Sequence, residues 1–129
     1  MLDHIGITVS DFERSRAFYL AALAPLGYRI LKQLPAAAGF GVAEGERKSA
    51  DQAGEFWIAH GAPRAPLVHV AFSAGSRAEV DAFFACAVAA GGTDNGKPGV
   101  RPQYHANYYG AFVLDPDGYN VEAVCHRPG

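Results

Sequence analysis

The chain has 129 residues, half of them hydrophobic, and a formal net charge of −2, which together indicate a globular protein with one ordinary core. We expect no nucleic-acid partner, because the chain is slightly acidic and lacks a basic stripe. We expect no membrane partner, because its apolar runs are well short of the roughly 20 residues of a membrane span. Only two cysteines are present and the N-terminus lacks signal-peptide features, so we expect a cytoplasmic protein with reduced thiols.

Residues 2–9 alternate between an apolar and a mixed face, which predicts a strand. The apolar face carries Ile5, Ile7 and Val9, and His4 lies on the opposite, mixed face. A strand with one fully apolar face is expected to pack that face on a helix. His4 is therefore expected to point away from the helix layer.

A helix is predicted to follow this strand, because Ser10 and Glu13 have the spacing of a capping box. Pro25 and Gly27 are expected to end it. Three short strands are then predicted near residues 28–33, 38–43 and 55–60.

The second half of the chain repeats this order, beginning with a strand at 67–73 that places His69 on its mixed face. Ser76 and Glu79 again have capping-box spacing and predict a helix to about Ala90. No strand is assigned within the Gly- and Pro-rich residues 91–103. Two strands are predicted near 108–114 and 119–125, around a type I turn at 115–118.

An internal repeat relates the two halves, because an offset of 65 positions aligns His4 with His69 and Trp57 with Glu122. The sequence therefore predicts an α+β fold in which two βαβββ modules form one curled mixed sheet with a groove. We expect a single domain over residues 1–129. The modules would span about residues 1–62 and 66–126.

The four aligned residues would all point into this groove. Two imidazoles, from His4 and His69, and the Glu122 carboxylate are a donor set for iron or zinc that leaves coordination positions open. A carboxylate in an apolar strand must have a partner, and a protonated histidine would also serve. A metal site and a metal-free ion pair both satisfy these residues.

Three segments resemble the vicinal oxygen chelate superfamily, which includes glyoxalase I, extradiol dioxygenases, and fosfomycin- and bleomycin-resistance proteins. They are "HIGITVSDFERSRAFY" with its first strand and helix, "LVHVAF" with its second histidine strand, and "AFVLDPDGYNVEAV" with its closing hairpin. The resemblance implies a divalent metal (Fe, Mn, Zn or Ni) on His4, His69 and Glu122 and a homodimer. It also implies electrophilic catalysis of lyase, isomerase or dioxygenase type on a small oxygenated substrate.

Trp57 departs from the glyoxalase I pattern, because it occupies the position of a fourth, carboxylate or amide ligand in those enzymes. The resemblance therefore disfavours a classical glyoxalase I, unless a register slip brings Glu55 into that position. The alternative is a metal-free small-molecule binding protein of the bleomycin-resistance type. A structural interaction domain, with the groove plugged by Trp57, is a third hypothesis.

Several further residues are candidates for a site in the groove. His105 and Tyr109 are candidate general acids or bases. Other side chains are expected to contact a substrate, through apolar or aromatic walls or through a cation. These candidate substrate-binding residues are Trp57, Phe40, Tyr104, Tyr108 and Arg101.

Overall fold

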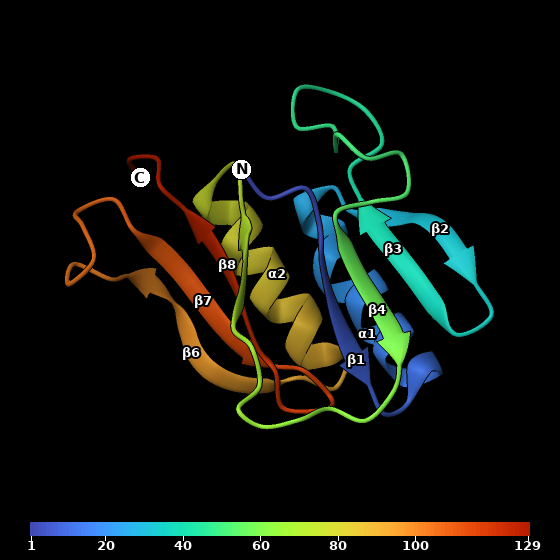
Figure 1. Cartoon of the computed structure of the whole chain (residues 1–129). Coiled ribbons are helices and arrows are strands. Elements are labelled where there is room, and N and C mark those ends of the chain that lie inside the picture. The colour runs from blue at the N-terminus through green and yellow to red at the C-terminus, as the bar shows by residue number, and fades with distance from the viewer.

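The computed structural model describes residues 1–129 and has an α+β fold in which the predicted element order occurs twice (Figure 1). The first module contains β1 (Ile5–Val9), α1 (Phe12–Leu23), a short 3₁₀ helix (Ala24–Leu26), β2 (Arg29–Leu34), β3 (Ala37–Gly41) and β4 (Phe56–His60). The second contains β5 (Val70–Ser73), α2 (Arg77–Ala89), β6 (Thr93–Val100), β7 (Tyr109–Leu114) and β8 (Asn120–Cys125).

Each module forms its own four-stranded mixed sheet, so both predicted βαβββ modules are present in the α+β fold. The strand orders are β1-β4-β3-β2 and β5-β8-β7-β6, with the first pair of each sheet parallel and the others antiparallel. The strand register confirms the internal repeat. Gly6 pairs with Trp57 in the first sheet, and Ala71 pairs with Glu122 at the corresponding place in the second.

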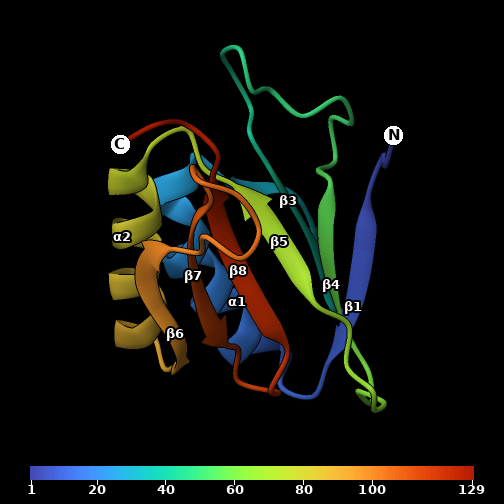
Figure 2. The same ribbon diagram turned by 90° about the vertical axis from the view of Figure 1, so that its left-hand side faces the viewer.

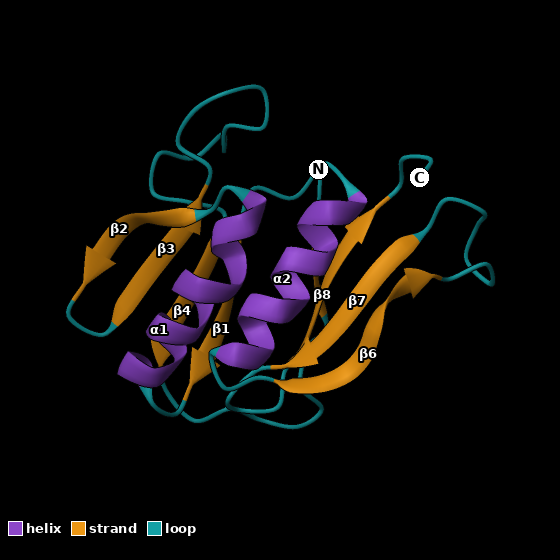
Figure 3. Cartoon of the chain, turned by 180° about the vertical axis from the view of Figure 1, so that it is seen from behind, coloured by secondary structure: helices purple, strands orange, loops and turns teal.

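The two helices lie side by side on one face of the two sheets (Figure 3). The view turned by 90° shows α2 on the left, the strands of the second module beside it, and β4 and β1 on the right, farthest from α2 (Figure 2). Ile7 and Val70 face the helices and are buried, whereas Thr8, Ala71 and Ser73 face the opposite side and are exposed. The apolar faces of both histidine-bearing strands therefore pack as predicted, and the mixed faces are left uncovered.

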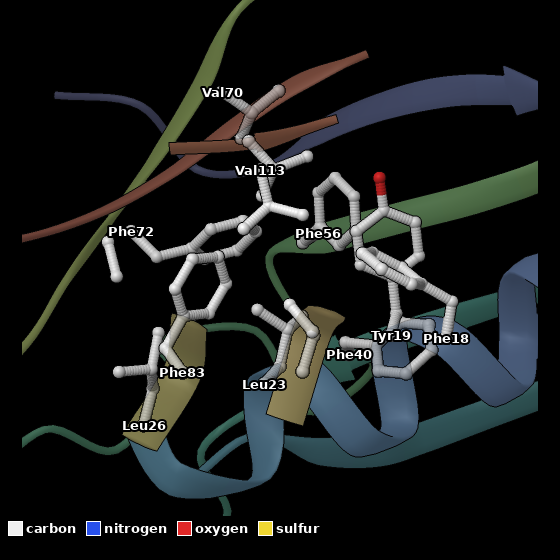
Figure 4. Close-up of a cluster of buried hydrophobic side chains, with 14 of the residues drawn as sticks. Phe18, Tyr19, Leu23, Leu26, Phe40, Phe56, Val70, Phe72, Phe83 and Val113 are labelled. Carbon is white, nitrogen blue, oxygen red and sulfur yellow. The ribbon is translucent and has the colours of Figure 1, made fainter. Parts of the chain in front are cut away.

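One hydrophobic core of 23 buried residues extends across both modules. Figure 4 shows the aromatic part of this core, in which Phe56 and Phe72 meet edge to face with ring centroids 5.1 Å apart. Tyr19 of α1 packs against the same Phe56 ring at 5.0 Å. Burying aromatic side chains contributes about 1.5–3 kcal/mol each, so this shared core holds the two modules together.

The two helices begin in different ways despite their similar sequences. The hydroxyl of Ser76 accepts a hydrogen bond from the backbone N–H of Glu79, which confirms the predicted cap of α2. At α1 the cap is Asp11, one residue later than predicted, because the hydroxyl and backbone N–H of Ser10 both donate to Asp117 of the other module. A contact between modules thus replaces the local capping pattern.

Strand β6 lies within the Gly- and Pro-rich stretch to which the sequence analysis assigned no strand. It is an edge strand, and its pairing with β7 shifts register on both sides of Gly96. Edge strands tolerate Pro and Gly because one side of their backbone needs no partner strand. Neither helix is long and apolar enough to cross a membrane.

Candidate functional site

His69 and Glu122 are brought together on the uncovered face of the second sheet. His69 directly precedes β5, and Glu122 lies on the neighbouring parallel strand β8. The Nε2 atom of His69 is 2.9 Å from Oε1 of Glu122. The Glu122 side chain is only 2% exposed, whereas that of His69 is 45% exposed, so the imidazole forms the outer side of the pair.

The hydrogen bond of the second ring nitrogen, Nδ1, shows which nitrogen of the His69 imidazole carries a proton. Nδ1 is 2.9 Å from the backbone carbonyl oxygen of Asn120, and a carbonyl can only accept, so Nδ1 carries a hydrogen. In a neutral imidazole Nε2 is then a bare acceptor facing an acceptor oxygen of Glu122. Two acceptors at this distance need a cation, either a proton shared between the imidazole and the carboxylate or a metal ion bound by both.

This donor pair fits a divalent first-row metal ion. Two ligands at right angles, each about 2.1 Å from one metal, are about 3 Å apart, close to the observed separation of Nε2 and Oε1. A histidine that donates its other N–H to a backbone carbonyl, as His69 does to Asn120, is the usual arrangement of a metal-bound imidazole.

Tyr108 and Gly110 close the inner side of the pair. The Tyr108 hydroxyl donates a hydrogen bond to Oε2 of Glu122, the oxygen not facing His69. Burial, followed by this hydrogen bond, raises the pKa of Tyr108, so its hydroxyl remains a donor. A Cβ atom at Gly110 would lie 3.1 Å from Oε2, so a larger residue would press on the carboxylate.

His4 does not join this pair within one chain. Its Nδ1 atom is 2.7 Å from Asp3, and that hydrogen bond raises the pKa of the His4 imidazole. The three residues whose ligand atoms lie within 4.8 Å of one another are Asp3, His4 and Asp51. The predicted set of His4, His69 and Glu122 is therefore divided between the two sheets.

Trp57 lies flat on its own sheet. Its indole N–H donates to the carbonyl oxygen of Gly54 at 3.2 Å, and its ring covers Gly39 so closely that a Cβ there would lie 2.7 Å from it. Trp57 therefore does not plug the pair of His69 and Glu122. Glu55 is held by the Tyr28 hydroxyl, and β4 shows no register slip that would move it.

The remaining candidate residues occupy several different places. Phe40 is fully buried in the core, on the face opposite to the pair, so its side chain lines no open surface. Tyr109 also turns to the helix side, where its hydroxyl donates to Asp81 of α2. Its acid–base role stays a prediction. Tyr104 is 61% exposed, and its ring centroid is 4.7 Å from that of Tyr108.

Arg101 and His105 lie in the loop that leads into β7. The guanidinium of Arg101 donates to two backbone carbonyls, of Lys97 and Gly99, and covers the ring of Phe112. Phe112 in turn stacks on His69 with ring centroids 6.1 Å apart. His105 is paired with His126, the two ring nitrogens being 2.9 Å apart.

The two largest hollows of the surface lie away from the pair. The largest, about 670 Å³, is an open cleft between the 42–47 loop and the start of α2 and mixes arginine with glutamate side chains. A second, about 550 Å³, lies between β1 and the 62–68 segment. Neither is lined by His69 or Glu122. A smaller hollow, about 170 Å³, is lined by His4 of the first module and by Val70 and Ala71, the two residues that follow His69.

Two contacts of the site were not foreseen from the sequence. The first is the carbonyl oxygen of Asn120, a backbone group that no sequence pattern marks. The second is Gly110, whose missing side chain makes room for Oε2 of Glu122. A glycine inside a strand pattern is a signal of close approach, so the Gly110 contact was open to prediction.

Comparisons with known proteins agree with this architecture. Residues 1–123 match the family model described as Glyoxalase/Bleomycin resistance protein/Dioxygenase superfamily. A solved glyoxalase/bleomycin resistance protein from Albidiferax ferrireducens T118 is 30% identical, with 99% of each chain covered and a TM-score of 0.78. The fosfomycin resistance protein FosX from Listeria monocytogenes is 21% identical, with 98% of this chain and 93% of that chain covered and a TM-score of 0.67.

A glyoxalase/bleomycin resistance protein/dioxygenase family enzyme from Burkholderia phytofirmans PsJN shares the fold at 17% identity, with 97% of this chain and 98% of that chain covered and a TM-score of 0.71. No curated protein shows significant sequence similarity to the chain. The family model covers nearly the whole chain, and the repeated βαβββ order is present in the fold. The chain therefore belongs to the Glyoxalase/Bleomycin resistance protein/Dioxygenase superfamily.

Proposed function

We propose that the protein is a metal-dependent enzyme that acts on a small oxygenated substrate. The observation that carries this proposal is the pair of acceptors, Nε2 of His69 and Oε1 of Glu122, which face each other at 2.9 Å and require a cation. Membership of a superfamily that includes dioxygenases and a fosfomycin resistance protein among its solved relatives supports it.

His69 and Glu122 would hold a divalent ion such as Fe, Mn, Zn or Ni. When bound, this ion would supply Lewis-acid polarisation of a substrate oxygen and stabilise negative charge that develops on it. The carbonyl oxygen of Asn120 keeps the His69 imidazole in the tautomer with a free Nε2. The exposed outer face of His69 leaves the substrate a path to the site.

We further propose that a homodimer completes the site and that His4 of a second copy supplies the third ligand. Within one chain His4 is turned to Asp3, and the sheet faces bearing the two histidines are both uncovered. Two metal ligands from one chain leave an ion weakly held, whereas three are typical of catalytic sites. Packing the His4 face of one copy on the Glu122 face of the other would also cover the exposed Ala71 and Ser73.

The test is a metal titration of the purified protein with Mn²⁺, followed by calorimetry. Glu122→Gln keeps the shape of the side chain but removes its charge. It should weaken binding by more than about 100-fold, because losing a ligand costs more than losing one of its supporting partners. Asp51→Asn is the control, since it removes the charge of one carboxylate in the group of Asp3, His4 and Asp51 and leaves His69 and Glu122 unchanged. Loss of binding in Asp51→Asn but not in Glu122→Gln would contradict the proposal.

The dimer is tested separately, by sedimentation of the wild type and of His4→Ala. We expect a dimer of twice the 13.7 kDa chain mass, and His4→Ala should weaken Mn²⁺ binding without changing that mass. A wild-type monomer that binds Mn²⁺ through His69 and Glu122 alone would contradict the shared site while leaving metal binding intact.

A metal-free binding protein of the bleomycin-resistance type is the second candidate. One observation favours it, because a protonated His69 would also satisfy Glu122 in a complete ion pair. In that case the wild type binds none of the four metals.

A further inference from the structure

We propose that Tyr108 is a positioning residue for Glu122, and that the imidazole pair of His105 and His126 holds Tyr108 in place. This inference rests on the proposed role of Glu122 as a metal ligand. The Tyr108 hydroxyl donates to Oε2, while Oε1 faces His69. The two oxygens of the carboxylate therefore have different partners, and the hydroxyl fixes which of them faces His69.

The loop before β7 is closed on itself at Tyr108. The backbone N–H of Arg101 donates to the carbonyl oxygen of Tyr108 at 2.7 Å, and Tyr108 itself donates its N–H to the carbonyl of His105. Tyr108 is thus the last residue of a short loop whose two ends are tied together. Any displacement of this loop would move the hydroxyl away from Glu122.

The pair of His105 and His126 fastens this loop to the end of β8. The backbone N–H of Asn107 donates to Nδ1 of His105 at 3.1 Å, so the proton of a neutral His105 is on Nε2. Nε2 of His105 then donates to Nδ1 of His126 at 2.9 Å. His126 directly follows β8, the strand that carries Glu122, so the loop and the ligand share one anchor.

The aromatic ring of Tyr108 is enclosed by the same two imidazoles. It meets His105 and His126 edge to face, with ring centroids 5.5 and 5.3 Å apart. On the other side a Cβ atom at Gly110 would be 3.2 Å from Cε1 of Tyr108, so Gly110 allows the ring to approach the strand. The ring is therefore held from both sides with its hydroxyl at Glu122.

The experiment measures the Mn²⁺ dissociation constant of the intact protein by competition with a chelator. Tyr108→Phe keeps the ring and removes only the hydroxyl, and it should weaken binding by about 10–100-fold, as is typical for a lost partner of a metal ligand. Tyr104→Phe is the matched control, because its hydroxyl is exposed and has no partner in the site. Thermal melts check that both variants fold.

A double-mutant cycle separates positioning from general stability. His105→Ala should weaken Mn²⁺ binding in the wild type and have no further effect in Tyr108→Phe, because it acts through the hydroxyl. Wild-type affinity in a folded Tyr108→Phe, or an equal effect of His105→Ala in both backgrounds, would overturn the inference while leaving metal binding established. Absence of Mn²⁺ binding in the wild type would instead overturn the proposed function and this inference with it.

Discussion

Replacing Asp115 with alanine should strongly destabilise the protein. The Asp115 side chain is 4% exposed and lies between the two modules. Its Oδ2 atom accepts a hydrogen bond from the hydroxyl of Tyr19 on α1 at 2.6 Å. Its Oδ1 atom accepts the backbone N–H groups of Asp117 and Tyr119, both at 2.9 Å.

The magnitude follows from these three donors. A hydrogen bond to a charged group contributes about 1.5–3 kcal/mol, and a buried donor left without a partner costs about 1–3 kcal/mol. Tyr19 is fully buried and Tyr119 is only 4% exposed, so Asp115→Ala would leave buried donors without their partner. We therefore expect Asp115→Ala to lower the free energy of unfolding by about 3–5 kcal/mol. Tyr19→Phe, which removes one donor, should cost about 1–3 kcal/mol.

Urea denaturation followed by circular dichroism measures both changes. Asp3→Ala is the matched control, because Asp3 is exposed and its side chain is hydrogen-bonded only to its neighbour His4, so we expect a change below about 0.5 kcal/mol. The double variant of Tyr19 and Asp115 should lose less than the sum of the single losses, since both remove the same contact. A loss below about 1 kcal/mol for Asp115→Ala would refute the reasoning.

Three further predictions concern stability. Burial raises the pKa of Tyr19 and Tyr28, so the native phenols stay neutral while those of the unfolded chain ionise near pH 10. The free energy of unfolding should therefore fall as the pH rises above about 10, and constant stability there, in urea titrations at each pH, would argue against it. Burial also raises the pKa of Asp115 in the native state. The contribution of Asp115 to the free energy of unfolding should therefore fall as the pH rises from about 4 to the native pKa, and Asp115→Asn should remove this pH dependence. Gly39→Ala would place a Cβ 2.0 Å from the backbone carbonyl oxygen of Ala53 and 2.7 Å from the Trp57 ring. It should therefore cost at least about 1–3 kcal/mol and shift the fluorescence of this single tryptophan; an unchanged spectrum would show that the ring does not lie there.

The repeat made the fold predictable to a large extent. Alternation around His4 and His69 indicated both which residues form strands and which face packs on the helices, because burial of apolar surface decides both. Strand β6 was not predicted, because its Gly and Pro residues leave no alternation of apolar and polar side chains. A strand of this composition is possible because β6 lies at the edge of its sheet. The first residue of α1 was predicted one position too early, because the Ser10 hydroxyl donates to Asp117 of the other module and does not cap the helix.

The candidate site was predictable only within one module. Residues on the same sheet, such as His69 and Glu122, are placed by strand register, and the offset of 65 positions identified them. The position of His4 relative to His69 and Glu122 depends on how the two sheets lie against each other. An internal repeat in the sequence does not determine the arrangement of the two sheets. The support of Glu122 by Tyr108 depends on a loop conformation, which side-chain periodicity does not describe.

The central claim is that His69 and Glu122 hold a divalent metal ion. The most direct measurement is a crystal structure of protein loaded with Mn²⁺, with anomalous scattering recorded at the manganese edge. We expect one anomalous peak per chain, within about 2.0–2.3 Å of Nε2 of His69 and of Oε1 of Glu122. A peak at Asp3, His4 and Asp51 alone, or no peak with Nε2 and Oε1 still 2.9 Å apart, would contradict it.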